Sequence, residues 1–398
     1  MSWPVVKLGD VLKNVQPGFA SGKDLEDGTL QVRMNNVKPD GSWDWNKKRI
    51  VPATDKQIEK YSLEVGDVLF NATNSAEQVG KSALYSTIVE NTVCFSNHFL
   101  RLRTDNKRLL PQYLVRYLSY LWRIRVFENM VDAWVNQATV RREDFLNLEI
   151  PLPPLDEQKR IAAILDKADA IRQKRKQAIT LADEFLRSVF LEMFGDPVTN
   201  PKGWEEPILS DIADVRSGVT KGKKLKEGTG ITLPYMRVAN VQDGYLDLSS
   251  IQTITVSEKD AEKCKLLRGD ILLTEGGDPD KLGRGHVWNG EIDNCIHQNH
   301  IFSVRVKDED YVRPAFLSAV IGSQRGKRYF LKVGKQTTGI ATINKTVLSE
   351  FCPIVPPLEL QDSYLKIASR IKRMQTRKHY HEVTLFPSLS QKAFSGQL

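Results

Sequence analysis

The stretch Pro151-Leu-Pro-Pro-Leu-Asp-Glu-Gln158 decides the fold, because it starts a helix that is longer than one ordinary domain needs. Its prolines favour an extended chain before the helix, and Asp156 and Glu157 suit the positive end of a helix dipole. Gly195-Asp-Pro197 stops the helix. A helix of about 35 residues measures ~50 Å at 1.5 Å per residue, so we expect another element to lie along it.

Apolar residues recur along this helix at alternating steps of three and four, which is the pattern of a coiled-coil seam. The predicted seam consists of Ile161, Ile164, Ala168, Ile171, Ala178, Ala182, Phe185 and Val189. Only Arg175 interrupts the pattern, over about four heptads. The sequence therefore predicts that these residues pack along a second helix.

The order of motifs begins again after Pro197, which indicates a duplicated chain. Gly66-Asp67 is matched by Gly269-Asp270, and Gly80 by Gly283. Further matches are Asn97-His98 with Asn299-His300, Ala138-Thr139 with Ala341-Thr342, and Pro151–Gln158 with Pro353-Ile-Val-Pro-Pro-Leu-Glu-Leu-Gln361. An ordered series of this kind predicts two copies of one unit, whereas a solenoid would need more and shorter repeats.

Each copy is therefore expected to be a globular α+β unit of mixed strands and helices, followed by a long helix. The predicted boundaries are 1–152, 153–195, 196–355 and 356–398. Within the first unit, 110–130 is predicted to be an amphipathic helix. The second long helix is less regular, and Pro387 is expected to kink or restart it. Its apolar face consists of Leu365, Ala368, Ile371, Leu385 and Leu389.

Two long helices of similar length, separated by a compact domain, can pair with each other. We expect an antiparallel coiled coil with the globular units at its opposite ends. The chain of 398 residues is large enough for two such domains with real cores.

The formal charge of +8 points to an anionic partner, most simply nucleic acid, although a merely basic protein is the alternative.

The four cysteines, Cys94, Cys264, Cys295 and Cys352, are scattered and form no CxxC pair, which fits the reducing cytoplasm. The N-terminus lacks the apolar core of a signal peptide, and no apolar run approaches the ~20 residues of a membrane span.

Candidate catalytic motifs fail on inspection. Gly80-Lys81-Ser82 resembles the end of a phosphate loop, but Ser75 stands where that loop needs glycine. No GxGxxG sequence follows a predicted strand, and no Asn/Asp-Pro-Pro-Tyr/Phe methyltransferase motif occurs. Asp278-Pro-Asp280 is only a faint hint of a metal nuclease, and the setting of Cys352 favours a buried thiol. We therefore predict neither a catalytic residue nor a metal site.

Polar, basic and aromatic residues in the loops point instead to DNA binding, because Lys and Arg neutralise phosphates while Arg, Asn and Gln bind purine edges. In the first unit the candidates are Arg33, Asn35, Asn36, Trp43, Trp45, Lys47, Lys48, Arg49, Thr73, Asn74, Lys81, Asn136, Gln137, Arg141 and Arg142. In the second unit they are Lys221, Lys223, Lys224, Lys226, Arg237, Asn240, Lys281, Arg284, Gln336 and Thr337. These loops differ more between the copies than the framework does, as expected of modules that read different sequences.

Three motifs together resemble the specificity subunit of type I restriction-modification systems, and the resemblance covers essentially the whole chain. They are Pro151–Ile161, Phe190-Leu-Glu-Met-Phe-Gly-Asp-Pro197 and Gln391-Lys-Ala-Phe-Ser-Gly396. In the second copy of the helix-start motif, Leu360 replaces the more usual acidic residue.

The resemblance implies two target recognition domains, each reading one half of a split double-stranded DNA site, and two central helices that pair and dock two methyltransferase subunits. It also implies that the partner subunits, including the restriction subunit, hold S-adenosylmethionine, ATP and Mg²⁺, while this chain holds no cofactor. Two other functions remain as alternatives: a DNA methyltransferase or nuclease with degenerate motifs, and a scaffold for acidic protein partners.

Overall fold

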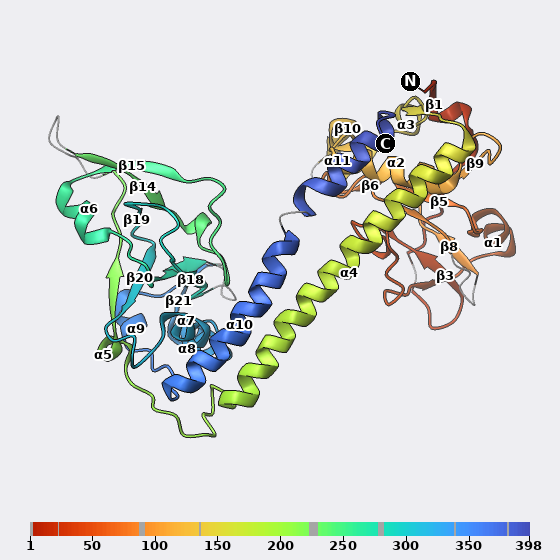
Figure 1. Cartoon of the computed structure of the whole chain (residues 1–398). Helices are drawn as coiled ribbons and strands as arrows, with labels where there is room; N and C mark the ends of the chain where they lie inside the picture. Colours follow the sequence, from red (N-terminus) through yellow and green to blue (C-terminus); the bar gives the residue numbers. More distant parts are fainter. Residues whose placement is uncertain are drawn as a thin grey trace. The chain divides into compact units, whose positions relative to one another are not determined.

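The computed structural model describes residues 3–22, 24–86, 92–134, 137–222, 230–277, 282–337, 340–379 and 382–398 (Figure 1). The chain divides into two compact units, which we call unit 1 and unit 2. Unit 1 comprises Met1–Gln177 together with Arg377–Leu398, and unit 2 comprises Ala178–Thr376. Each unit therefore joins one globular domain to part of each long helical segment.

The main sheet of unit 1 is antiparallel and has the strand order β2-β9-β5-β7. It is accompanied by the sheets β4-β3-β8 and β10-β11-β6 and by the pair β1-β12. The strands are β1 (Val5–Lys7), β2 (Leu12–Pro17), β3 (Thr29–Val32), β4 (Ile50–Val51), β5 (Val68–Asn71), β6 (Thr73–Asn74), β7 (Ser82–Leu84), β8 (Val93–Phe95), β9 (Phe99–Thr104), β10 (Val131–Trp134), β11 (Gln137–Val140) and β12 (Glu149–Pro151). β1 pairs with β12, so the N-terminal strand lies beside the segment that leads into the first long helix.

Unit 2 repeats this arrangement, which confirms the predicted duplication. Its sheets have the orders β13-β20-β16-β18, β15-β14-β19 and β17-β22-β21, and β14 and β19 are parallel just as β3 and β8 are. The strands are β13 (Ala213–Ser217), β14 (Ile231–Met236), β15 (Gln252–Val256), β16 (Ile271–Thr274), β17 (Gly276–Gly277), β18 (Gly285–Val287), β19 (Ile296–His297), β20 (Ile301–Val306), β21 (Lys335–Thr337) and β22 (Ile340–Thr342).

The helices cover the sheets and connect the domains to the long segments. They are α1 (Asp55–Tyr61), α2 (Pro111–Arg123), α3 (Arg142–Leu146), α4 (Leu155–Phe194), α5 (Leu209–Ile212), α6 (Glu258–Cys264), α7 (Pro314–Ile321), α8 (Gln324–Val333), α9 (Lys345–Ser349), α10 (Leu358–His379) and α11 (Glu382–Phe394), with short 3-10 turns at Leu8–Asp10, Met34–Asn36, Phe127–Asn129 and Val238–Asn240. The helix predicted over 110–130 is shorter, because Arg125 adopts a positive φ of 61° that a continuing helix does not allow.

Gly80 and Gly283, the matched glycines of the two units, are required for close packing of their turns. Gly80 and Gly283 both have positive φ, of 89° and 67°. A Cβ atom at Gly80 would lie 2.2 Å from the ring of Phe127, and one at Gly283 would lie 2.5 Å from the ring of Phe330. Only glycine therefore allows these turns to pack against the buried phenylalanine.

In each unit the buried aspartate of the repeated Gly-Asp pair forms an ion pair with a partly exposed arginine. The Asp67 carboxylate accepts from the Glu64 backbone N–H at 2.8 Å and from the Arg103 Nε at 2.7 Å. Asp270 accepts from the Leu267 N–H at 2.9 Å and from the Arg305 Nε at 2.6 Å. Since an unpaired buried charge is strongly unfavourable, each pair stabilises the turn before a central strand.

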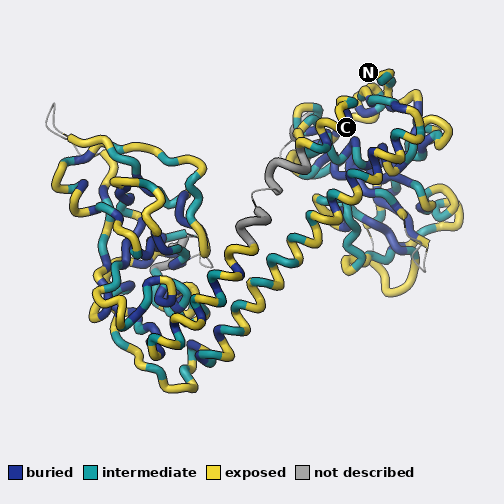
Figure 2. Tube along the Cα trace, viewed as in Figure 1, coloured by how far each residue is buried: buried dark blue, intermediate teal, exposed yellow. Residues whose placement is uncertain are grey.

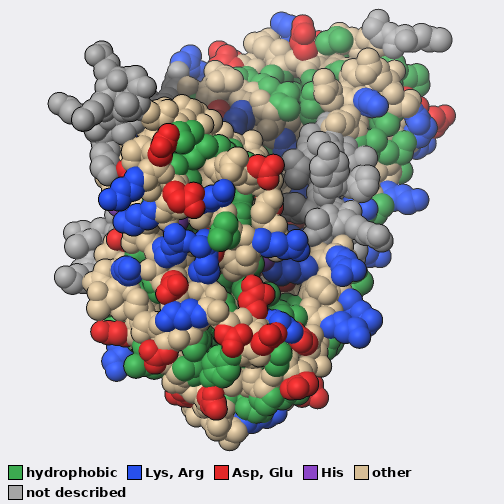
Figure 3. All heavy atoms as spheres, turned by 60° about the vertical axis from the view of Figure 1, so that its left-hand side comes forward, with side chains coloured by type: hydrophobic (Ala, Val, Ile, Leu, Met, Phe, Trp, Pro, Cys, Tyr) green, Lys and Arg blue, Asp and Glu red, His purple; other side chains and the backbone are tan. Residues whose placement is uncertain are grey.

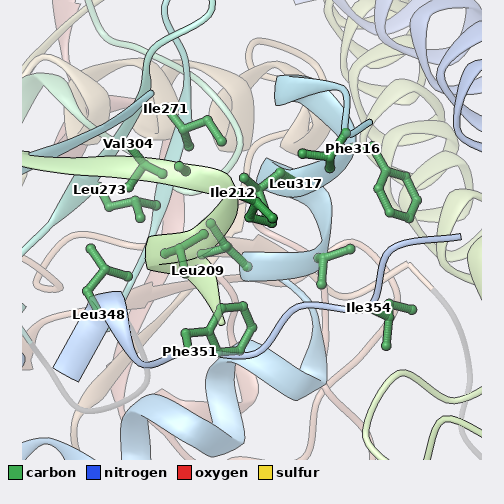
Figure 4. Packing of buried hydrophobic residues seen from close by; sticks show 14 of the residues in the cluster. Leu209, Ile212, Ile271, Leu273, Val304, Phe316, Leu317, Leu348, Phe351 and Ile354 are labelled. Atoms are coloured by element: carbon green, nitrogen blue, oxygen red, sulfur yellow. The ribbon is translucent and has the colours of Figure 1, made fainter. Parts of the chain in front are cut away.

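Each unit has its own hydrophobic core. In unit 2, residues from α5, β16, β20, α7, α9 and the segment before α10 point toward one another, among them Leu209, Leu273 and Leu317 (Figure 4). Tyr364 of α10 and Phe190 of α4 belong to the same cluster, and their ring centroids lie 5.5 Å apart. The second long segment therefore starts against the end of α4.

The second long segment consists of two helices, α10 and α11, rather than one. α10 ends at His379 and α11 begins at Glu382, so the new helix begins before Pro387 and not at it, and that proline lies inside α11. The end of α11 packs in unit 1, where the Phe394 ring lies 5.0 Å from Tyr117 of α2. Within unit 1, the same core cluster contains Ile161 of α4.

The predicted helix seam is only partly right. Val189 and Leu365 pack against the core of unit 2, which also contains Ala368. Ile161 belongs to the core of unit 1, and Leu389 packs against that core. Ile171 and Phe185, however, are 43% and 57% exposed, and the exposed middle of α4 is visible in Figure 2. The inner face runs instead through other residues, namely Leu165, Asp169, Leu186 and Phe190. The predicted seam residue Leu385 has a side chain outside the described residues.

A buried glutamine amide connects each long segment to the domain before it. Gln158 accepts from the N–H of Leu110, the residue before α2, at 2.9 Å, and donates to the carbonyls of Arg108 and Pro153 at 2.8 and 2.9 Å. Gln361 accepts from the N–H of Arg313, the residue before α7, at 2.9 Å. Its Nε2 donates to the carbonyls of Tyr311 and Pro356 at 3.1 and 2.8 Å. Both side chains are fully buried.

We predict that Gln158→Leu and Gln361→Leu each reduce the free energy of unfolding by about 2 to 4 kcal/mol, because each leaves buried backbone groups without partners. Hydrogen exchange should show the loss mainly in unit 1 for Gln158→Leu and mainly in unit 2 for Gln361→Leu. The exposed Gln177 on α4 provides the control, since Gln177→Leu should leave both units unchanged. Equal exchange in all three variants would contradict this role.

Candidate nucleic-acid interface

Three predicted DNA-contact residues of unit 1 meet on one small sheet. Thr73 and Asn74 form β6, which pairs with β11, the strand that starts at Gln137. The Thr73 hydroxyl lies 3.1 Å from that of Thr139, and Asn74 Oδ1 accepts from the Ser75 N–H at 2.9 Å. Gln137 is exposed. The corresponding sheet of unit 2 is β17-β22-β21, whose β21 includes the predicted residues Gln336 and Thr337.

The two tryptophans of unit 1 that were predicted to contact DNA, Trp43 and Trp45, form a packed aromatic cluster rather than an open platform. Trp43 and Trp45 stack with ring centroids 5.0 Å apart, and both meet Tyr85 edge-on. The Trp43 Nε1 donates to the Leu84 carbonyl at 2.9 Å. The tryptophans thus hold the surrounding loop against the core of unit 1.

That loop presents exposed polar and basic side chains. Asn35, Lys47 and Lys48 are exposed, and the Lys47 ammonium lies 3.6 Å from the Asp44 carboxylate. Exposed ion pairs of this kind are worth little, so Lys47 can exchange its partner for a phosphate.

The predictions that Asn36 and Asn240 contact DNA are wrong, because both amides are buried and fully used inside the protein. Asn36 Oδ1 accepts from the Arg33 N–H at 2.8 Å, and its Nδ2 donates to the carbonyls of Asp44 and Lys47. Asn240 binds Arg237 N–H, Asp247 and Ser250 in the same way. Each asparagine closes the loop that follows a 3-10 turn.

Lys81 is likewise a structural residue, contrary to the prediction. It is 7% exposed, and its ammonium donates to the Val37 carbonyl at 2.8 Å. Burial, with a smaller contribution from Lys47, lowers the pKa of Lys81. The corresponding position after the glycine of unit 2 is Arg284.

Three predicted arginines have a buried donor that remains unused. The Nε atoms of Arg33, Arg237 and Arg284 are buried and have no acceptor within the described part of the chain. Arg33 and Arg237 occupy the same place in their units, directly before a matched 3-10 turn. Arg49, another predicted residue, donates to the Ser21 carbonyl at 2.8 Å. An arginine with an unused donor is suited to bind an incoming acceptor such as a phosphate or a purine edge.

The remaining residues predicted to contact DNA are either exposed or lie outside the residues that the structure describes. Arg141, Arg142 and Lys221 are exposed, and Arg142 donates to the Val15 carbonyl at 3.1 Å. Outside the described residues lie Asn136, Lys223, Lys224, Lys226 and Lys281, and the side chains of Gln336 and Thr337. In Figure 3, Lys and Arg side chains gather across the middle of the visible face.

Two features of unit 2 were not predicted from the sequence. His300 Nδ1 lies 2.7 Å from Glu275 Oε2, in a pair exposed to solvent. The repeat matches His300 to His98 of unit 1, but unit 1 has no carboxylate that corresponds to Glu275.

The second feature is a cavity of about 630 Å³ between α4, α10, α7 and β18. Phe190 and Tyr364 contribute to its apolar wall. In unit 1, Arg116 of α2 binds Asp166 and Asp169 of α4. Ala319 of α7 occupies the position in unit 2 that corresponds to Arg116.

Burial shifts the pKa values of two ionisable groups outside the predicted interface. Burial lowers the pKa of His286, which lines the cavity, to about 4, and it raises the pKa of the Cys94 thiol to about 11. Across the described ranges, no group of three or more His, Cys, Asp or Glu side chains is arranged to bind a metal ion. Among the helices of the described residues, none combines the length and apolar character needed to cross a bilayer.

Comparison with known proteins relates both halves of the chain to one family. A family model described as the type I restriction modification DNA specificity domain matches residues 2–181 and 201–383. A putative type I restriction enzyme MjaX specificity subunit from Methanocaldococcus jannaschii is 27% identical, over 53% of this chain and 50% of that protein. The EcoKI specificity subunit of Escherichia coli K12 is 23% identical, over 92% of this chain and 82% of that protein.

Solved structures share the fold. The S subunit of a type I restriction-modification system from M. genitalium superposes with a TM-score of 0.58 at 15% identity, covering 99% of this chain and 96% of that one. A second chain, from work on complex assembly and conformational transition of the type I system, has a TM-score of 0.54 at 19% identity and covers 100% and 98%.

We predict that Asn36→Ala lowers the free energy of unfolding by about 1 to 3 kcal/mol, since three backbone groups lose their partner. The neighbouring Asn35 is exposed, so Asn35→Ala should leave stability unchanged. Urea denaturation of both variants checks this. Equal stability of the two variants would contradict the structural role of Asn36.

Proposed function

The chain belongs to the family of type I restriction-modification specificity subunits, and from this we propose that it is the DNA-reading subunit of such a complex. In this proposal each globular domain reads one half-site of a bipartite, asymmetric double-stranded DNA target. The chain itself is non-catalytic. Two methyltransferase subunits dock on its long helices, and restriction subunits join through the complex.

The observation that carries DNA reading is the pair of matched arginines, Arg33 and Arg237. Each has a buried Nε donor that finds no acceptor among the described residues, and the two arginines occupy the same place in their units. The asparagine three residues further along the chain, in contrast, accepts a hydrogen bond from the backbone N–H of the arginine in both units. A buried donor left unpaired is unfavourable, so its presence in both units suggests an external acceptor. The net charge of +8 supports an anionic one.

Two different half-sites are supported by the contrast between framework and loops. The strand orders and the buried asparagines are the same in both units. Trp43 and Trp45 of unit 1, however, are replaced by the smaller Leu246 and Leu248 in the core of unit 2. Modules with one framework and different loops are suited to present different side chains to base edges.

Docking of a protein partner is supported by the outer face of α4. Leu181 and Phe185 are 63% and 57% exposed and lie one helical turn apart. Large apolar side chains exposed together on a helix favour a second helix as partner. The cavity of unit 2, where Ala319 replaces an arginine, is a second place into which a partner side chain can fit.

Catalysis is assigned to the partner subunits. S-adenosylmethionine is expected in the methyltransferase subunits, and ATP and Mg²⁺ in the restriction subunits. If the chain were instead a degenerate methyltransferase or nuclease, the purified chain alone would modify or cut DNA. If it were a scaffold for acidic proteins, it would bind no duplex even with a methyltransferase present.

The function is tested by mapping methylated bases genome-wide in cells with and without this chain, in the presence of its methyltransferase. We expect one bipartite, asymmetric motif with an unread spacer to lose methylation when the chain is removed. Phe185→Glu should abolish this methylation while leaving duplex binding by the chain intact, because it introduces a charge into the docking face. An unchanged methylation map without the chain would refute the function.

Phosphate contact by the exposed loop of unit 1 makes a separate prediction. The double change Lys47→Ala and Lys48→Ala should weaken binding to all duplex sequences and lower the slope of log K against log[salt] by about 2. Titration at several salt concentrations measures this slope. The control is Lys107→Ala, at an exposed lysine in the turn after β9, and it should leave the slope unchanged. A slope that stays constant in the double variant would exclude phosphate contact there.

A further inference from the structure

Glu275 and His300 stand side by side at one end of the main sheet of unit 2. Glu275 directly follows β16, and His300 directly precedes the antiparallel neighbour β20. The Glu275 N–H donates to the His300 carbonyl at 3.0 Å. Their side chains are 30% and 58% exposed and meet through the His300 Nδ1 and the Glu275 Oε2 at 2.7 Å.

This pair adjoins the small sheet that carries predicted base contacts. The N–H of Ile343, directly after β22, donates to the Glu275 carbonyl at 2.8 Å. The next residue, Gly276, pairs with Thr342 of β22, and β22 pairs with β21, which includes Gln336 and Thr337. The corresponding sheet of unit 1 gathers Thr73, Asn74 and Gln137. Glu275 and His300 therefore lie at the edge where unit 2 is proposed to read DNA.

Unit 1 has the same backbone at this place but different chemistry. Ala72 follows β5 and His98 precedes β9, and the Ala72 N–H donates to the His98 carbonyl at 2.9 Å. The histidine is thus common to both units, while the carboxylate is present only in unit 2. A chemical difference on a shared backbone is what two modules with different base preferences require.

We propose that Glu275 is a base-reading residue of unit 2 and accepts a hydrogen bond from the N4 amino group of a cytosine in the half-site that this unit reads. This inference rests on the proposed function. A carboxylate is repelled by DNA phosphates, so its place on such an edge calls for a compensating donor, and cytosine N4 is the donor that acidic side chains accept from in the major groove.

His300 is a positioning residue in this arrangement. Its Nδ1 binds Oε2 of Glu275. The other carboxylate oxygen, Oε1, has no hydrogen bond within the described residues and in this proposal faces the base. Adenine is read instead by Asn or Gln, because its N7 acceptor needs a donor that a carboxylate lacks.

The test measures base preference with the assembled complex of this chain and its methyltransferase subunits. Binding is compared across duplexes in which each position of both half-sites carries each of the four base pairs. Glu275→Gln should change the preference at one position of one half-site by about tenfold, from cytosine toward adenine, since an amide both donates and accepts. His300→Ala should weaken the cytosine preference at the same position. Glu350→Gln, at an exposed carboxylate directly after α9, serves as the charge-matched control and should change no position.

The outcomes separate this inference from the function on which it rests. If the wild-type complex shows no sequence preference at all, the proposed function fails. If the wild type reads a bipartite site and Glu275→Gln leaves every position unchanged, the base-reading role of Glu275 is refuted. A uniform loss of binding at all positions in Glu275→Gln would also refute it, because that result would identify a general effect on charge or folding.

Discussion

The buried amides of Gln158 and Gln361 are the constraint on which the rest of the structure depends. Each sits in the first turns of a long helix and binds two backbone groups of the preceding domain, one of them the N–H just before α2 or α7. The third partner is the carbonyl of a proline just before the start of the same helix. A helix attached at one point only could leave the domain in many directions. The two hydrogen bonds to the domain, in an interior that excludes water, hold the first turns of the helix in one orientation. Glutamate at these positions would lack the two donors and would bury a charge.

Much of the framework could be predicted because its causes are local or repeated. The helix-start motif, the Gly-Asp turns and the glycines at Gly80 and Gly283 recur in order, and each meets a requirement that few other residues meet. The duplication and the long helix α4 followed from these positions. The inner face of α4 could not be predicted in this way, because it includes the charged Asp169, which forms ion pairs with Arg172 and Arg116. A search for apolar spacing passes over such a residue and selects the exposed Ile171 and Phe185 instead.

The candidate interface could be predicted only as a set of loops. An asparagine in a polar loop has the same sequence signature whether it binds DNA or its own backbone, and Asn36 and Asn240 do the latter. The same ambiguity applies to Lys81, which binds the Val37 carbonyl. What distinguishes these residues is burial, which arises from contacts between segments distant in sequence. The pair of Glu275 and His300 depends on a strand register and could not be inferred from spacing.

The division of the chain into units has a consequence for the order in which it can fold during synthesis. Unit 2 is one continuous segment, Ala178–Thr376, and all of its parts are available before residues 377–398 are made. Unit 1 needs Arg377–Leu398, whose Phe394 covers the rings of Tyr113, Tyr117 and Tyr120 on α2. The domain that leaves the ribosome first is therefore the last to be completed. Until then, a nascent chain displays an aromatic surface that distinguishes it from a finished one.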